Sequence, residues 1–495
     1  MLYITILNFM VMYRSRLKND LNEITLEYVS SLFDDAEIAF YDIAGTQAHV
    51  IMLYEKKIIT KSDAKKILVA LEKLKKEKFD KKSDAEDIHE LIEQHVITKI
   101  GMASGGKMHT GRSRNDQVSL DIRMKIRDDI NLLCQCLLNT IQTLVSLAQK
   151  HQKTIMPLYT HMQQAQVGLF SHYLLSYTDA MFRDLERLYV TYGRVNESPL
   201  GAGPIGGTSI PIDRQSTAKL LGFKGIVENS IDATSTRDYV IEYVAAVAIL
   251  MTNLSRLAED FVIWSTSEFA FIELPDEFTS PSSVMPQKKN PDILELTRGK
   301  TAQVIGNLTT ILSIVKGLPS GYNRDLQQIK PSIWSSSRIA ITALIVIKSM
   351  LEKINVDNQN MKKAIEGGYL VALDIAESLV NNGMPFRTAH QIVGNLVKTA
   401  HNSKKPLEKL SIDEIKRSTK GIDPKSIKKI IDSTSISSSL QNRISQGSSG
   451  IGEQKRMIQH RMDKINAYKT GITKRGNEVK TVFSNLTLKV KSLTK

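Results

Sequence analysis

Apolar residues recur along most of the chain at three- and four-residue spacing, the period of an α-helix with one buried face. Residues 67–74 and 88–100 follow this pattern, with Lys and Glu between the apolar positions. Longer segments are apolar over most of their circumference, at residues 122–147, 239–263, 308–315 and 339–351. Helices of that kind are typical of the interior of a bundle. The pattern therefore predicts an all-α protein built around a bundle of long central helices.

Glycine and proline gather in four places, each at the expected end of a long helix: residues 101–111, 199–211, 275–291 and 319–321. Loops held by rigid helices are where reacting groups tend to lie. The composition changes near residue 357, beyond which the expected helices are shorter. We predict an N-terminal helical domain at residues 1–111, whose first 11 residues could be an extension before a start at Met12. A central long-helix domain at 112–357 and a C-terminal helical domain with a basic tail at 358–495 complete the division.

Positive charge is concentrated at the C-terminal end of the chain. The formal net charge is +14, and residues 401–495 hold 21 Lys and Arg against 8 Asp and Glu. Such a tail can be a solvated surface, an anion docking site or a nucleic-acid contact. Interleaved aromatics and zinc-finger or helix-turn-helix spacing, which are typical of nucleic-acid binders, are missing from it. We therefore favour a solvated surface and expect no nucleic-acid partner.

The two cysteines and the lengths of the apolar runs indicate the cellular compartment of the protein. Cys134 and Cys136 lie about 200° apart around a helix, so they cannot share a metal or a disulfide. Buried thiols fit a reducing compartment, and we expect a cytoplasmic protein. We find no run of about 20 apolar residues and expect no membrane span.

The segment SPSSVMPQKKNPD, residues 280–292, carries the most chemistry. It places two hydroxyls, two ammonium groups and two carboxamides between Ser282 and Asn290. Lys and Asn can neutralise and orient carboxylates. A serine hydroxyl becomes a usable base only where positive charge and N–H donors stabilise its alkoxide. Composition alone would fit a polar turn between helices equally well.

This loop resembles the SSxMPxKxNP signature of the fumarase, aspartase and argininosuccinate lyase superfamily. The resemblance implies a fold in which five long helices from each of four subunits form a twenty-helix bundle. It also implies a reaction that releases fumarate. By that match Ser282 is the base, and Lys288 and Asn290 stabilise the carbanion, with Ser283 the neighbouring candidate. The residue before the serine pair is usually Gly, whereas here it is Pro281, which stiffens the loop.

Two further segments resemble blocks of the argininosuccinate lyase family in particular. KMHTGRSRNDQV, residues 107–118, is similar to the HTGRSRNDQ block, which makes Arg114 and Asn115 substrate contacts. MPLYTHMQQAQ, residues 156–166, is similar to MPGYTHLQ, so Thr160 would hold the substrate and His161 would transfer a proton. Without the match, a charged helix start and a surface histidine would explain these residues.

The remaining matches concern the other part of the substrate. LPSGYNRDLQQIK, residues 318–330, resembles LPxxYNxDLQxxK and implies contacts from Tyr322, Gln327 and Lys330 to the arginine part or its carboxylate. Residues 30–49 resemble the N-terminal substrate-gripping stretch, which makes Ser31 a binding candidate. Residues 199–214 and 229–242 resemble two scaffolding blocks. The resemblance runs from about residue 13 to about residue 458.

The resemblance implies β-elimination of argininosuccinate to arginine and fumarate, in arginine biosynthesis, without a metal or a bound cofactor. Ser282 is the favoured base and His161 acts on the leaving-group side, although the opposite assignment stays open. The family builds each site from three subunits, so we expect a homotetramer. Two alternatives remain, an adenylosuccinate lyase with the same signature loop and a non-catalytic structural protein of the same fold.

Overall fold

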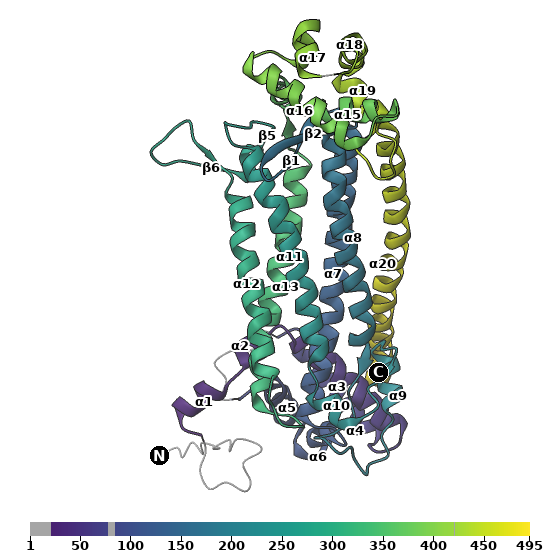
Figure 1. Cartoon of the computed structure of the whole chain (residues 1–495). Coiled ribbons are helices and arrows are strands. Elements are labelled where there is room, and N and C mark those ends of the chain that lie inside the picture. The colour runs from purple at the N-terminus through teal and green to yellow at the C-terminus, as the bar shows by residue number, and fades with distance from the viewer. Residues whose placement is uncertain (1–20, 78–84, 420) are drawn as a thin grey trace.

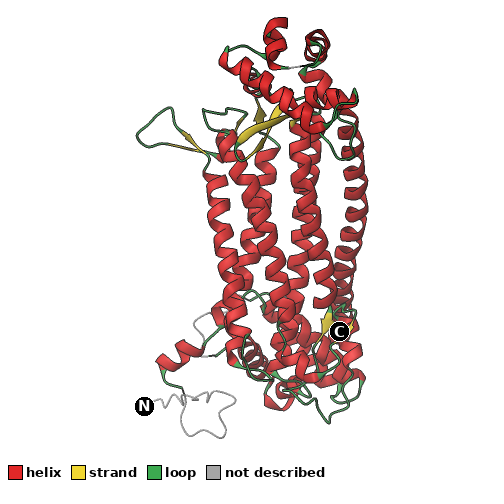
Figure 2. Cartoon of the chain, viewed as in Figure 1, coloured by secondary structure: helices red, strands yellow, loops and turns green. Residues whose placement is uncertain are grey.

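The computed structural model describes residues 21–77, 85–419 and 421–495. Long helices run side by side along an elongated molecule, and the few strands are short and lie near its ends (Figures 1 and 2). The predicted all-α fold with a bundle of long central helices is therefore confirmed. The suggested extension at residues 1–11 lies outside the described residues.

Five helices form the central bundle: α7 (Arg114–Lys150), α8 (Phe170–Val195), α11 (Asp238–Trp264), α12 (Asp292–Val315) and α13 (Lys330–Leu351). The first begins at a capping box, in which the Ser113 side chain accepts from backbone N–H and Asp116 accepts from the N–H of Ser113. At 1.5 Å per residue, the 37 residues of α7 span about 55 Å. The two ends of the bundle are therefore far apart.

One hydrophobic core runs through the bundle and into the N-terminal helices. The helix α11 is buried on most sides, and Tyr243 of this helix shares a 2.7 Å hydrogen bond with Ser337 of α13. An apolar helix with so few exposed positions can be accommodated only among other helices. This is the arrangement that the hydrophobic pattern predicts.

Short elements close the two ends of the bundle. The N-terminal end, near the start of α7, holds α1 (Glu23–Val29), α2 (Leu32–Asp35), α3 (Ala39–Glu55), α4 (Lys61–Leu74), α5 (Ile88–Ile100), α6 (Met102–Gly105), α9 (Arg214–Leu220), α10 (Ser230–Ser235) and the pair β3 (Glu197–Ser198) and β4 (Gly225–Ile226). The other end, called the far end below, holds the antiparallel pairs β1 (Ile155–Thr160) with β2 (Gln163–Leu169), β5 (Ile272–Glu273) with β8 (Asn355–Val356) and β6 (Ser280–Pro281) with β7 (Lys289–Asn290).

The C-terminal residues 358–495 contain two kinds of structure. The helices α14 (Asn358–Ile365), α15 (Ala372–Asn381), α16 (Phe386–Asn402), α17 (Ile412–Ser418), α18 (Pro424–Ser433) and α19 (Ile436–Asn442) gather at the far end, and residues 375–431 there have a small core of their own. The 44-residue helix α20 (Ile451–Thr494) instead returns along the whole bundle to the N-terminal end.

The last part of the basic tail is a bundle helix, in which basic side chains such as Lys455, Lys469 and Lys474 are exposed on one face and apolar side chains pack on the bundle with the other. Apolar side chains recur on α20 every seven residues and join the main core: Ile458, Ile465, Ile472, Leu486 and Leu493. Arg475 is buried between α7 and α8, where its Nε donates to Asn131 at 2.6 Å and its guanidinium lies 4.1 Å from the Tyr192 ring centroid. Lys489 pairs with Glu55 of α3 at 2.6 Å. The helix therefore ties both ends of the molecule together.

Three segments of the bundle are long and apolar enough to cross a membrane by length and composition alone: residues 114–150, 238–264 and 324–351. None of the three is an uninterrupted run of about 20 apolar residues, because polar side chains occur within each of them. In the structure the three segments pack together in the bundle, and 56% of each window is buried.

Candidate active site

The predicted site residues divide into two groups at opposite ends of the bundle. Ser31, Arg114, Asn115, Tyr322, Gln327 and Lys330 lie at the N-terminal end, and Thr160, His161, Ser282, Lys288 and Asn290 lie at the far end. Arg114 begins α7, whereas the strand with Thr160 follows the end of that helix. Because α7 spans about 55 Å, one chain cannot bring the two groups together.

At the N-terminal end, Ser31 and Lys330 meet at one carboxylate. Ser31 Oγ donates to Asp35 Oδ2 at 2.7 Å, and Lys330 Nζ donates to Asp35 Oδ1. Lys330 begins α13 and is 1% exposed, while Ser31 is 7% exposed. Ile88 N donates to the same Asp35 Oδ2 at 3.3 Å, which links this group to the start of α5. In this structure the Lys330 ammonium is therefore neutralised by Asp35, which the sequence analysis did not include among the site residues.

Arg114 and Tyr322 lie around a second carboxylate. Arg114 Nη1 is 3.0 Å from Asp87 Oδ2, the N-cap of α5. The pKa of the Tyr322 phenol is raised, mainly by burial and also by the charge of Asp87, although the charge of buried Arg237 lowers it. Tyr322 also forms a hydrogen bond with Gln327. Arg114 and Tyr322 are thus both close enough to Asp87 to interact with its charge, and Gln327 bonds Tyr322. Asp87 has a helix-capping pattern as its only sequence signal, so sequence reasoning missed it.

The glycine-rich loop at residues 199–211 lies beside Asn115. Asp116 Oδ2 accepts from Gly203 N at 2.7 Å and from Gly201 N at 3.0 Å, and both glycines have positive φ. Burial raises the pKa of Asp116 to about 6, although its backbone N–H donors favour the charged form. Asn115 Nδ2 donates to Pro204 O at 3.0 Å. The family-like loop therefore holds the amide of Asn115 at the start of α7.

At the far end, His161 lies at the tip of the β1–β2 hairpin. Thr160 pairs with Gln163, so His161 and Met162 form a two-residue turn, and their φ angles are 53° and 58°. Positive φ at both positions is the type I′ geometry, which non-glycine side chains adopt at a cost of about 1 kcal/mol each. Thr160 and His161 are exposed. A strained and exposed histidine at a hairpin tip is consistent with a functional role.

The serine loop is the turn of the β6–β7 hairpin, which projects from the far end (Figure 1). Ser282 Oγ accepts from the backbone N–H of Met285 at 3.0 Å and of Val284 at 3.2 Å. Ser282 N donates to Lys288 O at 3.3 Å, which closes the loop. Two N–H donors directed at one hydroxyl oxygen favour its deprotonated form. They therefore distinguish Ser282 chemically within the serine pair.

The two lysines of the loop have different surroundings. Lys289 Nζ pairs with Asp276 at 2.7 Å, and this hydrogen bond raises the pKa of Lys289. Lys288 is exposed and, among the residues that the structure describes, its ammonium has no ion-pair partner. Asn290 Nδ2 donates to Ser280 Oγ at 3.4 Å. Lys288 is thus available to a ligand carboxylate, whereas Lys289 is held by the protein.

Comparison with known proteins identifies the family of the chain. A family model described as lyase matches residues 16–306, and one described as argininosuccinate lyase C-terminal matches residues 369–437. The curated argininosuccinate lyase of Nitrosopumilus maritimus is 67% identical over 477 residues, covering 96% of this chain and 98% of that protein. That of Methanocaldococcus jannaschii is 42% identical, covering 85% of this chain and 88% of the relative.

A solved structure has the same architecture. EDDS lyase in complex with formate matches with a TM-score of 0.84 and 27% identity, over 95% of this chain and 94% of that one. A variant of EDDS lyase with bound fumarate matches with a TM-score of 0.83 and 26% identity, again over 95% of this chain and 94% of that one. On the family models, the curated relatives and the bundle fold together, this chain belongs to the argininosuccinate lyase family.

Proposed function

We propose that this protein cleaves argininosuccinate into arginine and fumarate, as the last step of an arginine-forming sequence. The observation that carries the proposal is the geometry of Ser282, whose Oγ receives two N–H donors in the hairpin that also presents Lys288. Membership of the argininosuccinate lyase family supports the choice of substrate over adenylosuccinate.

The proposed step is a β-elimination. The Ser282 alkoxide removes a proton from the succinyl carbon next to a carboxylate, and the electron pair left on that carbon delocalises into the carboxylate. Lys288 and Asn290 stabilise the resulting negative charge. The electron pair then forms the C=C bond of fumarate as the C–N bond breaks. A proton from an acid, for which His161 is the candidate, completes the guanidinium of arginine.

The N-terminal end suits the arginine part of the substrate. It combines the carboxylates of Asp35, Glu86 and Asp87 with the cations of Arg114 and Lys330. Carboxylates bind guanidinium and ammonium groups in charge-assisted hydrogen bonds, and Arg binds carboxylates in the same way. A substrate that carries both signs of charge therefore fits this end better than a nucleotide phosphate does.

We further propose a homotetramer in which the N-terminal end of one chain meets the far ends of others. The bundle exposes apolar side chains where such contacts would form. Ile305 and Leu312, seven residues apart on one face of α12, are 47% and 46% exposed, and Ile345 of α13 is 50% exposed. Exposed apolar surface on long helices fits burial against further copies of the same bundle.

The cytoplasm is the proposed location. Both cysteines are free thiols, and burial raises the pKa of Cys134 to about 11. Arg475 Nη2 lies 3.5 Å from its Sγ atom. A thiol packed in this way has a structural role and fits a reducing compartment.

The proposed function is tested by the ultraviolet absorbance of fumarate, with argininosuccinate and then adenylosuccinate as substrates. We expect fumarate from argininosuccinate only, because the carboxylates at the N-terminal end complement its guanidinium. Release from adenylosuccinate alone would assign the chain to the other activity. A folded oligomer that releases fumarate from neither substrate would instead favour a non-catalytic role for this fold.

A further inference from the structure

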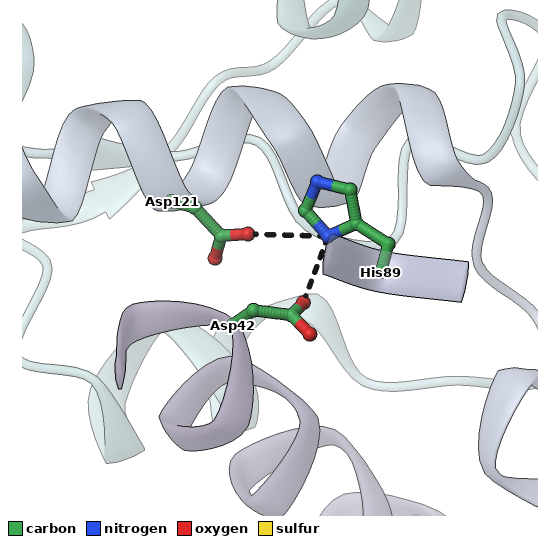
Figure 3. A group of neighbouring side chains, drawn as sticks. All are labelled: Asp42, His89 and Asp121. Atoms are coloured by element: carbon green, nitrogen blue, oxygen red, sulfur yellow. Dashed lines mark hydrogen bonds and ion pairs between the residues drawn. The ribbon is translucent and has the colours of Figure 1, made fainter. Parts of the chain in front are cut away.

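A buried polar cluster lies near the start of α7, where helices α3, α5 and α7 meet. His89 Nδ1 of α5 is 3.1 Å from Asp42 Oδ1 of α3 and 3.6 Å from Asp121 Oδ2 of α7 (Figure 3). All three side chains are buried, and the charges of Asp42 and Asp121 act on each other. None of the proposed catalytic steps uses these groups.

One imidazole and two carboxylates within 4.8 Å of one another could also hold a metal ion. Two neighbours favour a proton at His89 Nδ1 instead. Gln117 Nε2 donates to the Asp42 oxygen that faces Nδ1, so that oxygen already acts as an acceptor. The buried guanidinium of Arg112, held by Thr46 Oγ1 at 2.9 Å, acts electrostatically on both carboxylates, so it repels a doubly charged metal ion more strongly than a single proton.

The surrounding charges agree with a protonated imidazole. Burial lowers the pKa of His89, but the charge and hydrogen bond of Asp42 and the charges of Asp87 and Asp35 raise it overall. Burial and the adjacent Asp42 carboxylate raise the pKa of Asp121 well above its ordinary value. A charged His89 bonded to Asp42 and facing Asp121 would join three helices at one point.

The His89 side chain lies next to the residues that hold the candidate substrate contacts in place. His89 lies in the first turn of α5, two residues after Asp87, which pairs with Arg114 at 3.0 Å. In that stretch Ile88 N donates to Asp35 Oδ2 at 3.3 Å, and Glu86 O accepts from Ser31 N at 2.9 Å. Movement of the first turn of α5 would therefore displace Asp87 from Arg114 and the Ile88 N–H from Asp35.

We propose that His89 is a positioning residue, whose contacts with Asp42 and Asp121 hold the first turn of α5 against α3 and α7. These contacts set the distance between Asp87 and Arg114 at the N-terminal end of the site. This inference rests on the proposed function for its kinetic readout. It requires no contact between His89 and substrate.

The test compares His89→Leu with His89→Asn, whose amide can donate from the place of Nδ1. We expect His89→Leu to raise the KM for argininosuccinate about tenfold or more, since small misplacements of binding groups are costly. His89→Asn should restore most of the affinity. His95→Leu is the matched control: it changes the same residue type on the same helix, where His95 lies 3.7 Å from Glu77, away from the site. It should leave KM unchanged.

Amide hydrogen exchange of the substrate-free protein gives a second readout that does not depend on activity. In His89→Leu, exchange should become faster in residues 85–91 and 110–117 and stay unchanged elsewhere. An inactive wild type would contradict the proposed function, while the exchange result would still test the positioning role. If His89→Leu misfolds, Asp42→Asn replaces it, with the same direction of change expected, because it removes the charge that bonds His89 Nδ1. Wild-type KM with unchanged exchange would overturn the inference, as would a stoichiometric divalent cation in the wild type that His89→Leu loses.

Discussion

Replacing Ser282 by alanine is expected to lower kcat for fumarate release about 10³-fold, with little change in KM. The reason is that the backbone N–H groups of Val284 and Met285 both point at Ser282 Oγ and favour its alkoxide. Alanine removes the base and leaves the charged groups that bind substrate in place. The measurement is steady-state absorbance of fumarate at saturating argininosuccinate.

Ser283→Ala is the matched control for this variant. It removes a hydroxyl from the adjacent position of the same exposed turn, so any general effect on the loop should appear in both variants. We expect it to keep kcat within about threefold of the wild type, a difference typical of a non-catalytic contact. A large loss in Ser283→Ala with an active Ser282→Ala would move the base to the second serine.

Replacing Lys288 by methionine is expected to lower kcat about 10²- to 10³-fold, the range found when one donor to a developing negative charge is removed. The ammonium of Lys288 is exposed and faces no acidic partner among the described residues, so it is available to the carbanion. Methionine keeps most of the length of the side chain without its charge. Stopped-flow absorbance under single-turnover conditions would separate this step from product release.

Lys289→Met is the control, because it removes the same charge from the neighbouring position. Lys289 pairs with Asp276 at 2.7 Å and with Glu273 at 3.5 Å, outside the proposed chemistry. A small effect on kcat is expected there. Equal losses in both variants would mean that net charge on the hairpin, and not the place of Lys288, supports the reaction.

The sequence predicted α11 well because this helix is apolar on most sides. The segment 239–263 became α11 at Asp238–Trp264, since a helix apolar on most sides has only one favourable environment. The sequence analysis does not predict α20 as a bundle helix, because Lys and Arg occupy the positions between the apolar residues of its seven-residue repeat. The seven-residue spacing of Ile458, Ile465 and Ile472 does indicate a buried helix face, but the many charged residues between them favour a solvated segment.

Family resemblance predicts the members of the site, and their roles remain predictions. It nominates Ser282 and His161 because it acts on short segments. Such segments do not report that α7 separates Arg114 from His161 by its full length. Nor do they report that Lys330 is buried against Asp35, since this contact joins residues 295 positions apart. Pairings of that kind depend on tertiary packing, which local sequence does not contain.

We propose that one active site uses the N-terminal end of one chain and the far end of another, and co-expression of two inactive variants tests this sharing most directly. Arg114→Gln disables the N-terminal end and His161→Asn the far end, and each alone should be nearly inactive. In an equal mixture, about a quarter of the sites would combine two intact ends from different chains. As a control, Arg114→Gln mixed with Tyr322→Ala should stay inactive, because both defects lie at the N-terminal end.

We therefore predict that hybrid oligomers of Arg114→Gln and His161→Asn, purified through a different affinity tag on each chain, regain up to about a quarter of wild-type fumarate release. Hybrids that form in good yield but remain as inactive as their parents would contradict the shared site.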